Sequence, residues 1–138
     1  MKMLKRKIVV TIALMMVMIL SACLVYAYGN QASGTIDGVT VNVSNYISAD
    51  KKSASATTWT STPLADASVS VTFYWRLTVY PYTEGTTTMG NGNYGEITVN
   101  APSLANQNKE YYKVVSNHIA GYHGLIFSYP NLTTEVTP

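Results

Sequence analysis

Hydrophobic and polar residues alternate strictly over one long stretch of the chain. From residue 68 to residue 80 every second residue is apolar, and the residues between them are polar or tyrosine. The apolar positions are Val69, Val71, Phe73, Trp75, Leu77 and Val79. A period of two, with many β-branched and aromatic residues, is typical of a strand with one buried face. The pattern therefore predicts a long strand over residues 68–80.

Shorter segments repeat this pattern and predict further strands. They cover residues 39–44, 53–60, 96–100, 110–116 and 125–129. Clusters of Gly, Pro, Asn, Asp and Ser separate the segments, as is typical of turns. We expect Thr83–Gly95, rich in Gly, Thr and Asn, to be the longest loop. The sequence thus predicts an all-β fold, a small antiparallel β-sandwich or partly closed barrel of about six to eight strands.

The inward-facing apolar residues of these segments form the predicted core. They are Val69, Val71, Phe73, Trp75, Leu77, Ile97, Val99, Val114, Leu125 and Phe127.

The first 27 residues differ in composition from the rest. Residues 1–7 carry four positive charges, residues 8–20 are almost wholly apolar, and small residues follow up to Ala27. This is the order of a secretion signal peptide with its cleavage site. A transmembrane anchor is the alternative, because about 20 apolar residues can span a bilayer, but no charged stop follows Ala27. We expect residues 1–27 to be the signal peptide, a helix that is cleaved off, and residues 28–138 to form one secreted, extracellular domain.

Cys23 is the only cysteine in the chain. With Leu20, Ser21 and Ala22 it resembles a bacterial lipobox, whose cysteine is lipidated. The apolar run continues beyond Cys23, whereas lipoproteins usually turn polar at once, so the sequence favours release. A lipoprotein anchored to the cell-surface membrane is the alternative. Cleavage after Ala27 leaves no cysteine and no disulfide, which favours a bacterial protein, from a Gram-positive species.

Removal of the signal changes charge and composition. Five basic and seven acidic residues remain, a net charge of −2 with both histidines neutral. Such a domain has no electrostatic footprint for nucleic acid. Ten of the eleven tyrosines lie beyond residue 27. Tyr74, Arg76 and Tyr80 share the polar face of the predicted long strand, and a tyrosine-lined face can stack sugars or contact a protein. We take these three as a candidate binding face, the alternative being amphipathic rings that only cover an outer face.

Catalytic motifs are missing from the sequence. It has no Gly-x-Ser-x-Gly elbow, no His-Glu-x-x-His, no cysteine pair for zinc and no phosphate-binding loop. The acidic residues are spread singly along the chain. We therefore predict that the protein is not an enzyme and uses no cofactor, and a secreted hydrolase is the function with least support.

The two histidines are the remaining candidates for chemistry. His118 and His123 flank a predicted turn and could share a metal with Glu110 or Asp66. No third ligand is fixed by the spacing, and a metal site needs one. We expect two ordinary loop histidines and no metal.

One segment resembles a known family. Ser44-Asn45-Tyr46 followed by the Lys-Lys-Ser-Ala-Ser-Ala of residues 51–56 resembles the lactococcin-type secreted bacteriocins, over about 40 residues. Lys52 stands where that family usually has a histidine, and the chain continues past the family's usual end. The resemblance implies a secreted peptide that acts on the cell envelope of competing bacteria without catalysis.

These patterns favour a secreted, non-catalytic β-domain that binds at the cell surface or outside the cell. An envelope glycan or a surface protein is the expected partner. A bacteriocin-like toxin and a lipid-anchored surface protein are the alternatives.

Overall fold

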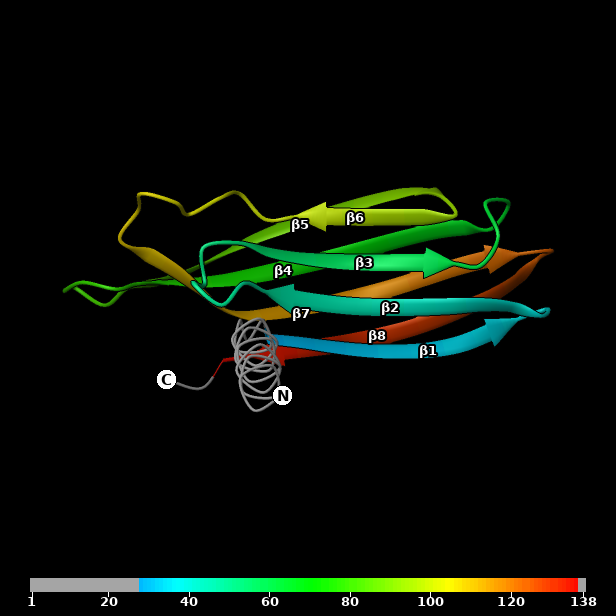
Figure 1. The fold of residues 1–138 in the computed structure, drawn as a ribbon, viewed down its shortest axis with the longest axis horizontal. Coiled ribbons are helices and arrows are strands. Elements are labelled where there is room, and N and C mark those ends of the chain that lie inside the picture. The colour runs from blue at the N-terminus through cyan, green and yellow to red at the C-terminus, as the bar shows by residue number, and fades with distance from the viewer. Residues whose placement is uncertain (1–27, 137–138) are drawn as a thin grey trace, which may run out of the picture.

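Two four-stranded antiparallel sheets pack face to face in the computed structural model, which describes residues 28–136 (Figure 1). The strands are β1 (Tyr28–Ile36), β2 (Val39–Ile47), β3 (Ala54–Thr60), β4 (Asp66–Leu77), β5 (Glu84–Tyr94), β6 (Glu96–Asn100), β7 (Lys109–Tyr122) and β8 (Leu125–Glu135). Sheet I has the order β1-β2-β3-β6 and sheet II the order β5-β4-β7-β8. Both sheets are open, so the prediction of an all-β sandwich is confirmed. The predicted signal peptide and Cys23 lie outside the described residues.

Tight turns join the hairpins at one end of the sandwich. Asp37-Gly38 connects β1 to β2, and His123-Gly124 connects β7 to β8; all four residues have positive φ. Two consecutive positive φ angles match the twist of a two-residue hairpin. At the same end Gly95, with φ of 77°, carries the chain from the edge of sheet II to the edge of sheet I. We call this the turn end, and the opposite end, where β1 begins, the N-terminal end.

Two sequence predictions about the strands were wrong in part. The long strand runs over Asp66–Leu77 and stops three residues before Tyr80. Thr83–Gly95 is mostly β5, an edge strand paired only with β4, and not a loop. Most of β5 is exposed on both sides, because it lies at the edge of the sandwich, so its sequence needs no apolar alternation.

The core lies between the sheets in two clusters. The larger contains Ile47, Ala54, Ala56, Val69, Val71, Phe73, Val99, Leu104, Tyr111, Val114 and Val136. The smaller contains Ile36, Val41, Val43, Ala120 and Leu132, with Phe127 packed against it. Most of the predicted core is confirmed, but Leu125 is 52% exposed because it directly follows the β7–β8 turn.

Within residues 28–136 no helix is long and apolar enough to cross a membrane.

Candidate functional site

The outer face of sheet I carries almost no charge. Strand alternation turns every second side chain of its strands away from the core. From β1 and β2 these are Gly29, Gln31, Ser33, Thr35, Thr40, Asn42, Ser44 and Tyr46. From β3 and β6 they are Ser55, Thr57, Trp59, Glu96, Thr98 and Asn100. We call this set the sheet I face; Glu96 is its one charged member.

Two aromatic side chains stand out from this face. Tyr46 is 41% exposed and Trp59 is 37% exposed. Trp59 lies opposite Asn42, which is four residues before Tyr46 on β2. At 3.4 Å per residue along a strand and 4.8 Å between strands, their Cα atoms are about 14 Å apart. Among the described residues no second ring and no cation lies over either side chain.

Two adjoining grooves run along β1 and β2 on this face. One, of about 500 Å³, is lined by Gln31, Ala32, Ser33, Asn42, Val43 and Ser44. The other, of about 430 Å³, is lined by Gly29, Asn30, Gln31, Ser44, Asn45 and Tyr46. The grooves share Gln31 and Ser44. Gly29 pairs with Tyr46 and has no side chain, so the flank of Tyr46 toward β1 stays open.

Polar side chains on the sheet I face are available to a ligand. Within the part of the chain that the structure describes, the side-chain amides of Gln31, Asn42 and Asn100 make no hydrogen bond. Each amide offers both a donor and an acceptor. The hydroxyls of Thr57 and Thr98 bond each other at 2.8 Å. The face can therefore stack flat apolar surface and hydrogen-bond uncharged polar groups.

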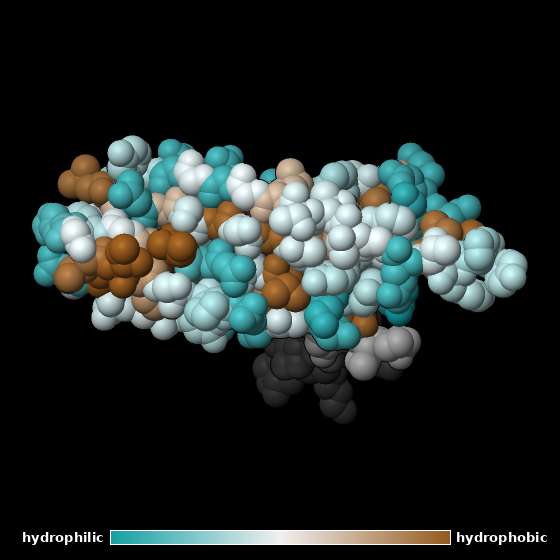
Figure 2. Space-filling view, turned by 180° about the vertical axis from the view of Figure 1, so that it is seen from behind, coloured by the Kyte–Doolittle hydropathy of each residue, from teal (hydrophilic) through white to brown (hydrophobic). Residues whose placement is uncertain are grey.

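The outer face of sheet II, the side seen in Figure 2, is different because two of its aromatic rings have cations over them. Tyr74 and Tyr112 are half-buried and meet edge to face, with centroids 6.3 Å apart. Arg76 lies over Tyr112, 5.3 Å from the centroid, and Lys113 over Tyr74 at 5.8 Å. Burial and the hydrogen bond to Glu84 raise the pKa of Tyr112. These rings are already occupied by neighbours from their own sheet.

The sequence-predicted binding residues do not form one surface. Tyr74 and Arg76 lie on β4, but Tyr80 lies in the loop between β4 and β5. Tyr80 is 85% exposed and meets Tyr82 edge to face, with centroids 6.3 Å apart. Arg76 is bound to Glu110, its Nη2 2.6 Å from Oε1. Tyr80 is therefore the most exposed of the three, whereas Tyr74 and Arg76 are half-buried.

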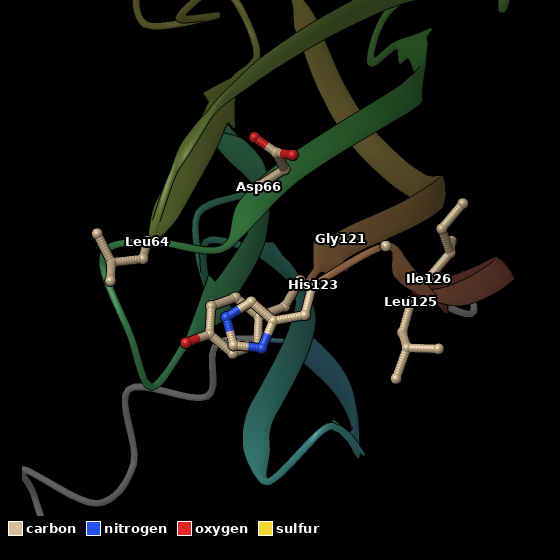
Figure 3. A pocket seen from close by; sticks show the side chains of 8 residues that line it. Leu64, Asp66, Gly121, His123, Leu125 and Ile126 are labelled. Carbon is tan, nitrogen blue, oxygen red and sulfur yellow. The ribbon is translucent and has the colours of Figure 1, made fainter.

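Aliphatic side chains gather at the turn end, where Figure 2 shows most of the apolar colour. Leu64, Ile119, Leu125 and Ile126 are 72%, 47%, 52% and 74% exposed. Leu64, Leu125 and Ile126 line a hollow of about 370 Å³ with Asp66 and His123, and lie on opposite sides of it in Figure 3. Aliphatic side chains and two ionisable ones, Asp66 and His123, line the hollow, which suits a contact surface better than a reaction.

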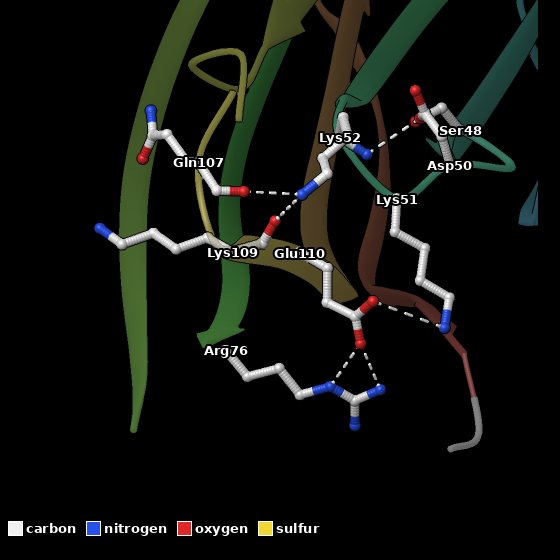
Figure 4. A network of polar contacts seen from close by, with 8 residues as sticks. All are labelled: Ser48, Asp50, Lys51, Lys52, Arg76, Gln107, Lys109 and Glu110. Atoms are coloured by element: carbon white, nitrogen blue, oxygen red, sulfur yellow. Dashed lines mark hydrogen bonds and ion pairs between the residues drawn. The ribbon is translucent and has the colours of Figure 1, made fainter. Parts of the chain in front are cut away.

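An ion network closes the N-terminal end, as Figure 4 shows. The Glu110 carboxylate binds Arg76 and also faces Lys51 at 3.8 Å. Lys52 donates through Nζ to the backbone carbonyls of Gln107 and Lys109, at 2.8 and 2.6 Å. These contacts hold the loops at that end together. The Glu110 carboxylate is already paired with Arg76 and Lys51 of the protein itself.

The two histidines lie in different surroundings, one buried and one exposed. His118 is not a loop residue as predicted; it lies in β7 and is fully buried between the sheets. His123 is exposed at the β7–β8 turn, where Nδ1 lies 2.7 Å from Oδ2 of Asp37. Within residues 28–136 no three His, Cys, Asp or Glu side chains come close enough to hold a metal ion.

His118 belongs to a buried polar chain that joins the sheets. Its Nδ1 lies 2.8 Å from the hydroxyl of Thr58, and its Nε2 lies 2.5 Å from the hydroxyl of Ser116. Thr58 also donates to the carbonyl of Ser68, and Ser116 to Oδ1 of Asn45. A neutral imidazole has one N–H, and the two hydroxyls have one hydrogen each. Three hydrogens are therefore available for these four contacts. Burial lowers the pKa of His118 to about 4, which keeps the ring neutral at pH 7.

No known family model matches this chain, and no curated protein matches its sequence. Function must therefore be inferred from the side chains themselves, and the sheet I face combines two exposed rings with amides that make no hydrogen bond within the described residues.

The sequence contained a signal for this face that we did not use. The alternation of Val39, Val41 and Val43 continues through Asn45 to Ile47, which turns Tyr46 outward. The same extension through Thr58 turns Trp59 outward. Asn45 and Thr58 hid the pattern because they are polar residues at buried positions. The register that places both rings on one surface comes only from the structure.

Proposed function

We propose that this protein is an exported, non-catalytic binding domain whose recognition surface is the sheet I face. The observation that carries the proposal is the pair of exposed rings, Tyr46 and Trp59, on a flat and almost uncharged sheet. Exposed aromatic side chains contribute much of the binding energy at recognition surfaces, because they bury a large area with little loss of side-chain freedom. The envelope of a bacterium is the proposed place of action.

The described strands are compatible with export. Tyr28, the first described residue, pairs with Ile47 in β2. Cleavage after Ala27 would therefore leave all eight described strands intact. The sandwich also holds no cysteine, so it needs no oxidising step after export.

Binding to isolated Gram-positive cell walls tests the proposal. We expect the purified protein to sediment with the walls, and Tyr46→Ala/Trp59→Ala to bind at least about tenfold more weakly. Both side chains point outward, so the double variant should keep the circular dichroism spectrum of the parent. Tyr94→Ala is the matched control, because Tyr94 is 67% exposed on sheet II. Equal binding by the parent and the double variant would contradict the proposal.

A bacteriocin-like toxin is the second candidate, and the aliphatic turn end favours it. Exposed apolar residues gathered at one end of a domain suit insertion into a membrane or a protein partner. If this function is correct, the purified protein inhibits the growth of Gram-positive strains, and Leu125→Ser/Ile126→Ser abolishes the inhibition. The Tyr46→Ala/Trp59→Ala variant would still inhibit. Growth unaffected by the parent protein would argue against the toxin.

A further inference from the structure

We infer that the sheet I face binds an extended chain of uncharged sugars, with one sugar ring on Trp59 and another on Tyr46. This inference rests on the proposed function and names the class of ligand that the face would take.

Charge is the first argument for an uncharged ligand. Glu96 is the only ionisable group other than Tyr46 on the sheet I face, whereas Asp66, Arg76, Glu84, Lys113 and Glu135 all lie on the outer side of sheet II. A polyanion would need cations to replace its counterions, and the sheet I face has none. A cationic partner would find one carboxylate at the rim, beside Trp59. A neutral ligand needs no ion pair, so the lack of charge on this surface does not weaken its binding.

The mixture of side chains is the second argument. A sugar ring has an apolar C–H face and a rim of hydroxyls that both donate and accept hydrogen bonds. Tyr46 and Trp59 offer flat apolar surface for the C–H face. Between and beside them, Gln31, Asn42 and Asn100 offer unused amides. A protein partner would be expected to bury a continuous apolar centre, and the two rings are separated by Ser44 and Thr57.

The spacing of the two rings sets the length of the ligand. Trp59 and Tyr46 are about 14 Å apart through their Cα atoms, with the Ser44–Thr57 pair between them. A single sugar is too short to reach both rings, so only a chain of several linked sugars can contact both. The adjoining grooves along β1 and β2, which share Gln31 and Ser44, run beside the line between the rings. A linear chain fits this path better than a branched cluster.

Titration with neutral oligosaccharides of increasing length tests this inference. The probes are β-1,4-linked oligomers of glucose and of N-acetylglucosamine, from the monosaccharide to the hexasaccharide, followed by calorimetry and by tryptophan fluorescence. We expect affinity to rise with length until both rings are covered, and then to level off. Binding should not change between low and high salt, because no ion pair forms.

Variants separate the two contacts. Trp59→Ala and Tyr46→Ala should each weaken binding of the hexasaccharide at least about tenfold and remove most of the gain with length. Tyr94→Ala should change neither. The fluorescence change should vanish in Trp59→Phe, since the other tryptophan of the sandwich, Trp75, packs on the core side.

Two results would overturn the inference. If no neutral oligomer binds while cell-wall binding still depends on Tyr46 and Trp59, the ligand is not a neutral glycan, although the proposed function stands. If oligomers bind equally well to the double variant, the sheet I face is not the glycan site. Loss of wall binding in the control Tyr94→Ala would instead count against the proposed function itself.

Discussion

We expect His118 to make the stability of this fold depend on pH. Burial lowers the pKa of its ring from 6.5 to about 4. As the pH falls below 6.5 the unfolded chain therefore takes up a proton before the folded one. The contribution to the free energy of unfolding is complete above pH 6.5 and is lost between pH 6.5 and 4, by about 3 kcal/mol. Urea unfolding at a series of pH values measures the loss.

Two histidine variants make this prediction specific. His118→Gln should unfold with a weaker dependence on pH between 6.5 and 4, whatever its stability at pH 7. His123→Gln is the matched control, because it removes the other histidine, which is exposed at the β7–β8 turn. Identical pH dependence in all three proteins would show that His118 is not responsible. An NMR titration should show one histidine changing near pH 4.

The buried polar residues also mark the limit of sequence reasoning at this scale. We predicted His118 in a loop because it flanks a predicted turn, but β7 continues through it to Tyr122. Ser116, His118 and Ala120, the inward positions of that part of β7, include no large apolar residue that would extend the strand pattern. Each polar side chain there can be buried because another residue makes a hydrogen bond with it. Two of those partners, Asn45 and Thr58, come from the other sheet. Such pairs join residues about 60 to 70 positions apart, so no local pattern reveals them.

At the scale of strands, the central elements could be predicted, and so could β6 and part of β8, but two of the four edge strands could not. β4 and β2 bury one full face, and their alternation is visible in the sequence. β1 and β5 are edge strands with few buried positions, and both escaped prediction. For β1 one signal was present: Asp37-Gly38 before Val39 is a strong hairpin turn, and it implies a partner strand before it.

Gly34 allows β1 to lie close to β8. It faces inward, and a Cβ at this position would overlap the ring of Phe127, which packs against the smaller core cluster. Gly34→Ala must therefore displace the ring or separate the strands. We expect the free energy of unfolding to fall by about 1–3 kcal/mol, the usual range for an overpacked core. Thermal or urea unfolding measures it.

Gly90→Ala is the control for this substitution. Gly90 also lies in an edge strand, but its Cβ would meet its nearest neighbour at 3.6 Å, an ordinary contact. Gly90→Ala should lower the free energy of unfolding by less than Gly34→Ala does. Equal losses in the two variants would mean that the general cost of a methyl group in an edge strand, and not the Phe127 ring, explains the effect.

At the scale of the whole molecule, the sandwich separates its chemistry by face and by end. The sheet I face is nearly uncharged, the outer side of sheet II is covered by paired charges and rings, and the turn end is aliphatic. All five basic residues after the predicted signal, Lys51, Lys52, Arg76, Lys109 and Lys113, lie toward the N-terminal end. The sequence could predict their number but not this separation, which depends on how the strands pair.

If the chain is exported, as we propose, the form in which it leaves the cell decides how its surfaces are presented. Release after Ala27 frees both ends and both faces. Lipidation at Cys23 would instead hold Tyr28 within about 17 Å of the lipid, at 3.4 Å per extended residue, and bring the N-terminal end to the membrane. We expect the protein in the culture supernatant to have the intact mass of a chain that begins at Tyr28. We also expect Cys23→Ala to leave its release unchanged. A diacylglyceryl mass on a chain beginning at Cys23, in the membrane fraction, would overturn this prediction. The proposed binding surface would then stay at the membrane of the producing cell and would not diffuse away from it.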